Sequence, residues 1–173
     1  MLCERLETKI LPDEIQSNGL REILRRYPTG VTVVTSLLDG KPWGGTMNSF
    51  TSVSMDPPTV AIFVMEKGRT TAAINQTGGF VVNILKHDQE KEAKQFASDN
   101  LPDKFHDIRY SESSKGIPVI DGSLGYIECD LLEARKIADH IMFLGSVASS
   151  EVTSDEEALV YYRRAFRSFT APS

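Results

Sequence analysis

The order of hydrophobic and polar residues predicts a mainly β structure with helices at its edges. Apolar residues recur at helical spacing, with charges between them, from residue 12 or 13 to about residue 27. Residues 31–38 are rich in β-branched side chains, which suit a pleated strand. Asp39 and Gly40 then form a hairpin turn signal, so a second strand is expected to begin near Lys41.

Further along the chain, prolines, glycines and changes of hydrophobic period separate the remaining elements. We expect strands at 43–53, 59–65, 80–85, 124–137 and 140–153, helices at 69–77 and 87–98, an irregular excursion at 99–123, and a short helix or extended arm at 155–169. Strands at hairpin spacing with helices at the edges predict a closed antiparallel barrel. The length of 173 residues fits a single domain over 1–173.

Charge and cysteine content exclude several classes of function. The net charge of −5 argues against general nucleic-acid binding, because a protein that binds phosphate backbones normally presents a basic face. Cys3 and Cys129 lie far apart without CxxC spacing, which excludes a disulfide scaffold and a cysteine zinc site, and Cys129 is expected in the core. Short arginine clusters are interpreted as solvated faces, at Arg21, Arg25, Arg26, Arg163, Arg164 and Arg167.

The sequence carries no targeting or common catalytic motif. The N-terminus lacks the apolar region of a signal peptide, and no apolar run approaches the ~20 residues of a membrane span, so we expect a soluble cytoplasmic protein. HxxxH, HExxH, GxSxG, Walker and GxGxxG patterns are absent, so no metal site and no Rossmann nucleotide fold is indicated.

Three segments place polar residues where a simple core strand would not. Residues 44–54 (GGTMNSFTSVS) combine glycines, hydroxyls and an amide, which suit the wall of a flavin ring site and equally an edge strand rich in serine and threonine. Lys67 and Arg69 flank a glycine where a short helix should begin, a weak indication of a phosphate site. His140 stands at the entry to an apolar strand, where a structural or a functional role is open.

Five segments taken together resemble a known family. They are residues 27–36 (YPTGVTVVTS), 45–60 (GTMNSFTSVSMDPPTV), 79–85 (GFVVNIL), 138–147 (ADHIMFLGSV) and 159–166 (LVYYRRAF). In this order they are similar to the flavin reductase family with the FMN-binding split barrel, over about residues 20–169. The resemblance implies a mainly β, α+β fold, an antiparallel Greek-key split β-barrel with helices at its edges.

The resemblance also implies site residues. The flavin would be bound by Thr46, Met47, Asn48, Ser49, Phe50, Thr51, Ser52, Lys67, Arg69, Thr70 and Phe80. Lys67, Arg69 and Thr70 would hold its phosphate, and His140 would lie beside nicotinamide and flavin as the catalytic residue. The family motif is Gly-Asp-His, whereas this chain has Ala138, so the turn before His140 is expected to be more restricted.

By the same resemblance the chain is expected to be an NAD(P)H-dependent flavin reductase. It would pass hydride from NADH or NADPH to FMN or FAD, and reduced flavin would diffuse to a partner monooxygenase. A homodimer without bound metal is expected. The alternative is a non-catalytic FMN-binding protein or a flavin-based electron carrier of the same fold.

Overall fold

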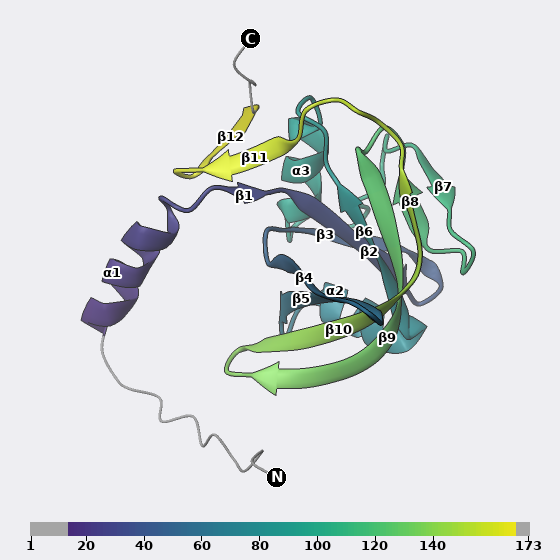
Figure 1. The fold of residues 1–173 in the computed structure, drawn as a ribbon, viewed down its shortest axis with the longest axis horizontal. Coiled ribbons are helices and arrows are strands. Elements are labelled where there is room, and N and C mark those ends of the chain that lie inside the picture. The colour runs from purple at the N-terminus through teal and green to yellow at the C-terminus, as the bar shows by residue number, and fades with distance from the viewer. Residues whose placement is uncertain (1–13, 169–173) are drawn as a thin grey trace.

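The computed structural model describes residues 14–168, with side chains from residue 18 onward. The helices are α1 (Glu14–Leu24), α2 (Arg69–Thr77) and α3 (Glu90–Ala97). The strands are β1 (Thr29–Gly30), β2 (Thr32–Leu38), β3 (Lys41–Met47), β4 (Phe50–Met55), β5 (Pro58–Met65), β6 (Gly79–Ile84), β7 (Tyr110–Glu112), β8 (Pro118–Ile120), β9 (Gly125–Ile137), β10 (His140–Val152), β11 (Leu159–Tyr162) and β12 (Ala165–Ser168). The predicted mainly β fold with antiparallel sheets and few helices is confirmed (Figure 1).

The largest sheet is curled, and its two edges are consecutive in the chain. Its seven strands follow the order β3-β2-β6-β9-β10-β5-β4. Strands β3 and β4 therefore form opposite edges, although only Asn48 and Ser49 separate them. Three residue steps span at most about 10 Å, so the sheet must curl until its edges approach, as Figure 1 shows. Within the described residues no pairing joins β3 to β4, so strand pairing does not close a barrel and leaves a seam at Asn48–Ser49.

Apolar side chains fill the curled sheet and fix two helices near the seam. Phe80 and Phe143 are fully buried in one cluster, together with Ile74 of α2. Phe96 of α3 belongs to a second cluster and meets Phe105 edge to face, with ring centroids 4.9 Å apart. Full burial of one such side chain contributes about 1.5–3 kcal/mol. Both helices pack against β2 and β3, which brings the start of α2 and the end of α3 to the same edge of the sheet.

Two predicted turns adopt the left-handed backbone that their sequences favour or tolerate. The β2–β3 turn has Asp39 at φ 53° and Gly40 at φ 72°. The long β9–β10 hairpin turns at Ala138 with φ 54°, a conformation that L side chains rarely adopt. Alanine in place of glycine is therefore held in a backbone conformation that it disfavours, as expected, and the turn nevertheless forms.

Four predicted boundaries need correction. The strand predicted at 43–53 breaks at the seam, because its two halves pair with opposite edges of the sheet. The excursion at 99–123 contains the β7–β8 hairpin, and the helix predicted from residue 87 begins at Glu90, after a turn held by Gln89. Of the short helix or extended arm predicted at 155–169, the extended alternative is the better one, because residues 159–168 form the β11–β12 hairpin. Tyr161 and Phe166 face each other across this hairpin and pack on the core.

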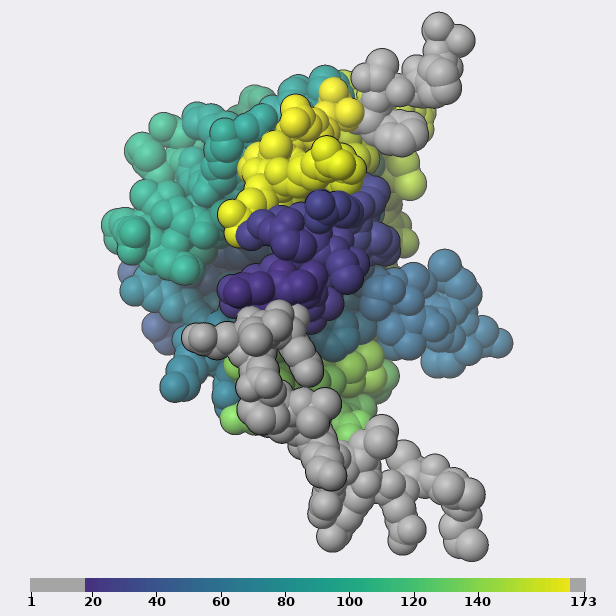
Figure 2. Space-filling view, turned by 90° about the vertical axis from the view of Figure 1, so that its left-hand side faces the viewer, coloured from purple at the N-terminus to yellow at the C-terminus, as the bar shows by residue number. Residues whose placement is uncertain are grey.

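Helix α1 and two hairpins form the outer parts of the molecule. The helix predicted from residue 12 or 13 is confirmed from Glu14, while residues 12 and 13, like Cys3, lie outside the described residues. Its apolar residues are solvent-exposed, Ile23 by 68% and Leu24 by 55%. In Figure 2 this helix lies beside the β11–β12 hairpin, and the β4–β5 hairpin, coloured blue, protrudes from the body. Within the described residues, no helix is long and apolar enough to cross a membrane.

Candidate functional site

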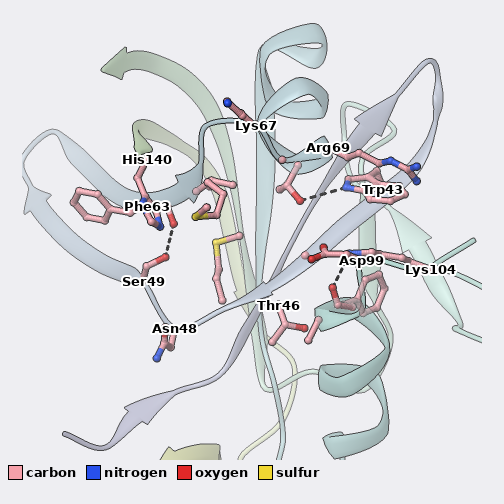
Figure 3. A pocket seen from close by; sticks show the side chains of 18 residues that line it. Trp43, Thr46, Asn48, Ser49, Phe63, Lys67, Arg69, Asp99, Lys104 and His140 are labelled. Atoms are coloured by element: carbon pink, nitrogen blue, oxygen red, sulfur yellow. Dashed lines mark hydrogen bonds between the residues drawn. The ribbon is translucent and has the colours of Figure 1, made fainter. Parts of the chain in front are cut away.

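A cavity of about 640 Å³ lies at the seam of the sheet, and we call it the seam cavity. Its wall is formed by the end of β3, the Asn48–Ser49 link, the end of β5, the start of α2, the end of α3 and the first residue of β10 (Figure 3). The structure brings together in this wall eight of the predicted site residues, Thr46, Met47, Asn48, Ser49, Lys67, Arg69, Thr70 and His140. Elements distant in the sequence thus meet at one place, because the sheet curls.

The polar residues at the seam are held in different ways. The Thr46 hydroxyl donates to the carbonyl of Ala93 in α3 at 2.6 Å, and the Ser49 hydroxyl donates to the carbonyl of Phe63 at 2.7 Å. These bonds fix both side chains and leave their oxygens able to accept. The exposed Asn48 side chain makes no hydrogen bond within the described part of the chain. Its amide is therefore the group at the seam that is free to donate to and accept from a ligand.

The paired glycines of β3 make room for side chains of the cavity. A Cβ added at Gly45 would lie 2.8 Å from the hydroxyl oxygen of Thr70, and one added at Gly44 would lie 2.9 Å from the Phe96 ring. The close approach predicted at these glycines thus brings neighbouring side chains, instead of a ligand, onto the backbone. Any larger residue here would displace Thr70 or Phe96 and reshape the cavity.

The turn between β5 and α2 brings cations to one end of the cavity. Gly68 precedes the helix in extended conformation, with φ −79° and ψ 150°, and no side chain caps the first N–H groups of α2. Lys67 and Arg69 flank this point and line the cavity with Thr70. Free backbone N–H groups beside two cations form a chemically suitable anion site.

Two further residues, missed from the sequence, complete this end. Trp43 is 7% exposed, and its Nε1 donates to the Thr70 hydroxyl at 3.3 Å. The guanidinium of Arg69 lies 5.3 Å from the Trp43 ring centroid, and the Lys104 ammonium lies 4.8 Å from it. Lys104 is only 4% exposed. Burial lowers its pKa, the nearby Asp99 opposes this, and Arg69 adds to it. Trp43 is the sole tryptophan, which was an available signal, whereas the burial of Lys104 depends on contacts with distant elements.

His140 lies at the opposite end of the cavity from Arg69 and Lys104 (Figure 3). It is the first residue of β10 and pairs with Met65 at the end of β5. Its Nδ1 lies 2.8 Å from a carboxylate oxygen of Asp139. This hydrogen bond lowers the pKa of Asp139 and orients the imidazole ring.

Four predicted flavin-binding residues lie outside the cavity wall. Phe80 is completely buried, and Phe50 packs against the same core cluster. Thr51 and Ser52 are exposed on β4, where the Thr51 hydroxyl donates to the Ser52 carbonyl at 3.2 Å. Phe50 and Phe80 therefore support the cavity from behind, and contacts of all four residues with a ligand stay predictions.

The sequence matches the family described as flavin reductase like domain over residues 24–170. The chain belongs to this family. It is 37% identical over 168 residues to the flavin reductase of Pseudomonas putida, covering 96% of this chain and 98% of that protein. It is 35% identical over 154 residues to the reductase subunit HsaB of a flavin-dependent monooxygenase from Rhodococcus jostii, covering 89% and 78% of the two chains.

Solved structures of this flavin reductase family agree with the fold. The NADH:FAD oxidoreductase of Streptomyces globisporus, in complex with NAD and FAD fragments, has a TM-score of 0.84 and 34% identity, covering 93% of this chain and 97% of that one. The names of all three relatives state flavin, and that of the Streptomyces globisporus enzyme also states NADH. The chain is thus an oxidoreductase of the flavin reductase family.

Two further findings concern metal ligands and the thiol of Cys129. Among residues 18–168 no group of three His, Cys, Asp or Glu side chains is placed to hold a metal ion. Cys129 is buried in the core, as predicted, and burial raises the pKa of its thiol to about 12. A thiol with that pKa stays protonated near neutral pH and is inert as a nucleophile.

Proposed function

We propose that this chain is an NAD(P)H:flavin oxidoreductase that reduces FMN or FAD and supplies the reduced flavin to a partner monooxygenase. The observation that carries the proposal is the seam cavity, which has cations at one end and His140 at the other. A nucleotide flavin has the matching shape, a planar ring joined through a flexible chain to a phosphate. Because reduced nicotinamide nucleotides are cytoplasmic metabolites, the proposal also places the enzyme in the cytoplasm.

The residues of the cavity fit a bound flavin. Lys67, Arg69 and Thr70, with the free N–H groups at the start of α2, would hold the phosphate. Thr46, Met47, Asn48 and Ser49 would line the ring, with the Asn48 amide facing its polar edge. Phe50, Thr51, Ser52 and Phe80 would flank the cofactor from the strands behind.

A bound flavin would supply the redox chemistry of the reaction, hydride acceptance from reduced nicotinamide. The protein's contribution is to hold the two rings in contact and to exclude water from between them. His140 is placed for this role, because Asp139 fixes its ring at the cavity rim. The cations and the N–H groups of α2 would stabilise negative charge on a ligand bound here.

The proposal extends to the assembly and to the finer fold. The curled sheet with its unpaired seam is a Greek-key split barrel, and the domain spans the chain. Large apolar side chains lie exposed at the ends of β4 and β10, Met55 by 82% and Val152 by 78%. A second copy of the chain would cover such residues, which supports a homodimer. Light scattering on the purified protein tests it, and a monomeric mass at micromolar concentration would contradict it.

The deciding experiment is NADH oxidation by the purified protein in air, followed by absorbance with and without added FMN or FAD. Rapid oxidation that depends on added flavin is the expected result. A yellow protein that keeps its flavin through desalting and leaves NADH unoxidised would overturn the reductase and indicate a flavin-binding or electron-carrier protein.

A further inference from the structure

The two ends of the seam cavity are joined outside its wall, where the β5–α2 turn meets the β9–β10 turn. Strands β5 and β10 are antiparallel, and Met65 at the end of β5 pairs with His140 at the start of β10. The residue after β5, Glu66, donates its backbone N–H to the carbonyl of Asp139 at 3.0 Å. This hydrogen bond fastens the turn that carries Lys67 to the turn that carries His140 (Figure 3).

A side-chain ion pair ties a third strand to the same point. Lys136 of β9 lies opposite Ile141 of β10, and its Nζ lies 2.7 Å from a carboxylate oxygen of Glu66. Because β10 lies between β9 and β5 in the sheet, this ion pair spans β10. Both side chains are partly open to water, so the pair stabilises the whole fold only slightly. Its effect is therefore expected to be local, on the two turns that it joins.

The β9–β10 turn is held by contacts from outside it. Ala138 keeps its φ of 54° without the conformational freedom of a glycine. The carbonyl of Asp139 is held by the N–H of Glu66, and the carboxylate of Asp139 lies 2.8 Å from Nδ1 of His140. A continuous series of contacts thus runs from Lys136 through Glu66 and Asp139 to the imidazole ring.

Glu66 also places a negative charge next to the cations of the anion site. It directly precedes Lys67, and neither Glu66 nor Lys136 belongs to the wall of the seam cavity. Lys136 neutralises this carboxylate, whereas in the described part of the chain no carboxylate oxygen lies within 4.0 Å of the Lys67 Nζ. The Glu66–Lys136 pair can therefore act on the site through backbone position and charge, while Lys67 stays available for a ligand.

We propose that Glu66, held by Lys136, is a positioning residue that links the anion site at the start of α2 to His140. An anion bound beside Lys67 fixes the β5–α2 turn, and the hydrogen bond from Glu66 to Asp139 passes this constraint to the turn before His140. The inference rests on the proposed function, because that function assigns the anion to flavin and His140 to the nicotinamide position. It adds that flavin binding prepares the nicotinamide end of the cavity.

The first test uses inorganic phosphate as the probe and does not depend on turnover. The imidazole NMR signals of the flavin-free protein are followed during a phosphate titration at constant pH and ionic strength. We expect the His140 signal, assigned with His140→Ala, to shift, while the signals of His87 and His106 stay in place because neither residue lines the cavity. Lys136→Met should reduce the His140 shift at least about twofold. A His140 signal that does not move, or that moves equally in both proteins, would overturn the inference.

The second test compares flavin affinity with kcat/KM for NADH in two variants. Lys136→Met and Glu66→Gln should each lower kcat/KM about two- to fivefold, because each breaks the ion pair. Flavin affinity should respond differently, since Lys136→Met leaves a free carboxylate beside the anion site and weakens binding, whereas Glu66→Gln removes that carboxylate and does not. Lys136→Arg should keep both quantities unchanged. Lys115→Met is the matched control, because it breaks the ion pair with Asp130 of β9 away from the cavity.

A combined variant decides whether the pair acts through His140. In a His140→Ala background, Lys136→Met should cause less than about 1.5-fold further loss of kcat/KM. A further loss as large as in the unaltered background would mean that Lys136 acts by another route, and equal losses of flavin affinity in Lys136→Met and Glu66→Gln would contradict the role of charge; either result overturns the inference and leaves the reductase standing. If neither flavin supported NADH oxidation by the unaltered protein, the proposed function would fail, and the phosphate titration would still decide the inference.

Discussion

Two groups of cations in this molecule differ in what surrounds them. Arg69 and Lys104 lie against the buried Trp43 ring, without a carboxylate at ion-pair distance in the described chain. The outer arginines line a smaller cavity of about 250 Å³ between α1 and the β11–β12 turn, namely Arg21, Arg25, Arg163 and Arg164.

Some members of the outer group have partners among their neighbours. Arg25 pairs with Glu22, which also lies 3.4 Å from Arg26, and Arg163 rests on the Tyr162 ring at 5.3 Å. Exposed charges are screened by water and salt, so each contributes little to binding. Arg69 is exposed like the outer arginines, so exposure does not separate all members of the two groups. What sets the inner group apart is the buried Lys104 and the shared contact of both inner cations with the buried Trp43 ring.

The largest expected effect is on flavin binding, and it is measured by replacing one cation of each group in a separate variant. Arg69→Ala should weaken flavin binding about tenfold to hundredfold, because a hydrogen bond to a charged group contributes about 1.5–3 kcal/mol. Arg164→Ala should change it less than about twofold. Titration of both variants with FAD checks this. Equal losses in the two variants would remove the distinction between inner and outer cations.

The next largest effect is expected on kcat/KM for NADH, when His140 at the opposite end of the seam cavity is replaced. His140→Ala should lower kcat/KM for NADH at least about tenfold, because the ring helps to shape the nicotinamide position, while the dissociation constant for flavin stays unchanged. Steady-state kinetics and flavin titration on the same preparation separate these two quantities. A change in kcat/KM below about twofold would contradict the role of His140.

A buried charge that is fully satisfied offers a useful contrast to Lys104. Glu128 is 1% exposed and accepts hydrogen bonds from Ser114, Ser149 and the Lys115 N–H. Burial alone would raise the pKa of Glu128, but these bonds and one from Ser113 hold it below its usual range. Its stabilising contribution is therefore present above the unfolded-state pKa and is lost as pH falls through the folded-state pKa.

Glu128→Gln should accordingly lower the free energy of unfolding by about 1–2 kcal/mol near neutral pH, with a smaller difference below about pH 4. Urea unfolding of both proteins at several pH values measures this. A difference that stayed constant with pH would mean that the carboxylate charge does not contribute.

Lys104 should behave in the opposite way in the ligand-free protein. Because burial lowers its folded-state pKa, the charged lysine is a cost to stability below that pKa, and the cost disappears as pH rises above the unfolded-state pKa. Lys104→Met should therefore raise the free energy of unfolding by about 1 kcal/mol near neutral pH. Thermal unfolding without flavin checks this, and a clear loss of stability would show that the lysine is satisfied within the fold.

The smallest expected effect is on stability, and it comes from the backbone of the outer arginines in the β11–β12 turn. Arg163 and Arg164 form the β11–β12 turn at φ 50° and 62°, a left-handed conformation that favours glycine. Arg164→Gly should stabilise the protein by about 0.5–1 kcal/mol by relieving this strain, with flavin reduction unchanged. A loss of activity in this variant would assign the outer arginines a role in binding.

Local sequence patterns predicted most of the fold. The strands at 59–65 and 80–85 carry nearly continuous apolar runs, and the turn at Asp39 and Gly40 follows from short-range chemistry. Ala138 adopts its left-handed backbone against its local preference. The β7–β8 hairpin could not be predicted in this way, because it is short and its three-residue strands carry little pattern. The β11–β12 hairpin depends on aromatic packing against the core, which local periodicity does not report.

The candidate site was predicted where its residues lie close together in the sequence. The link at Asn48–Ser49 and the turn at Lys67–Arg69 are both marked by glycines and polar groups within a few residues. Trp43 and Lys104 were missed because their importance depends on contacts between β3, α3 and a segment that looked irregular. Phe80 shows the reverse, since its place in a motif did not bring it to the cavity wall.

The link between β3 and β4 sets a limit on the size of what can enter the seam. Asn48 and Ser49 are the whole connection between the two edges of the sheet, so the number of residues there fixes how far apart the edges can stand. Each residue added would allow at most about 3.5 Å of further separation. Insertions or deletions at this one point are therefore a simple route, in natural variation or in engineering, to widen or narrow the opening without altering any strand of the sheet.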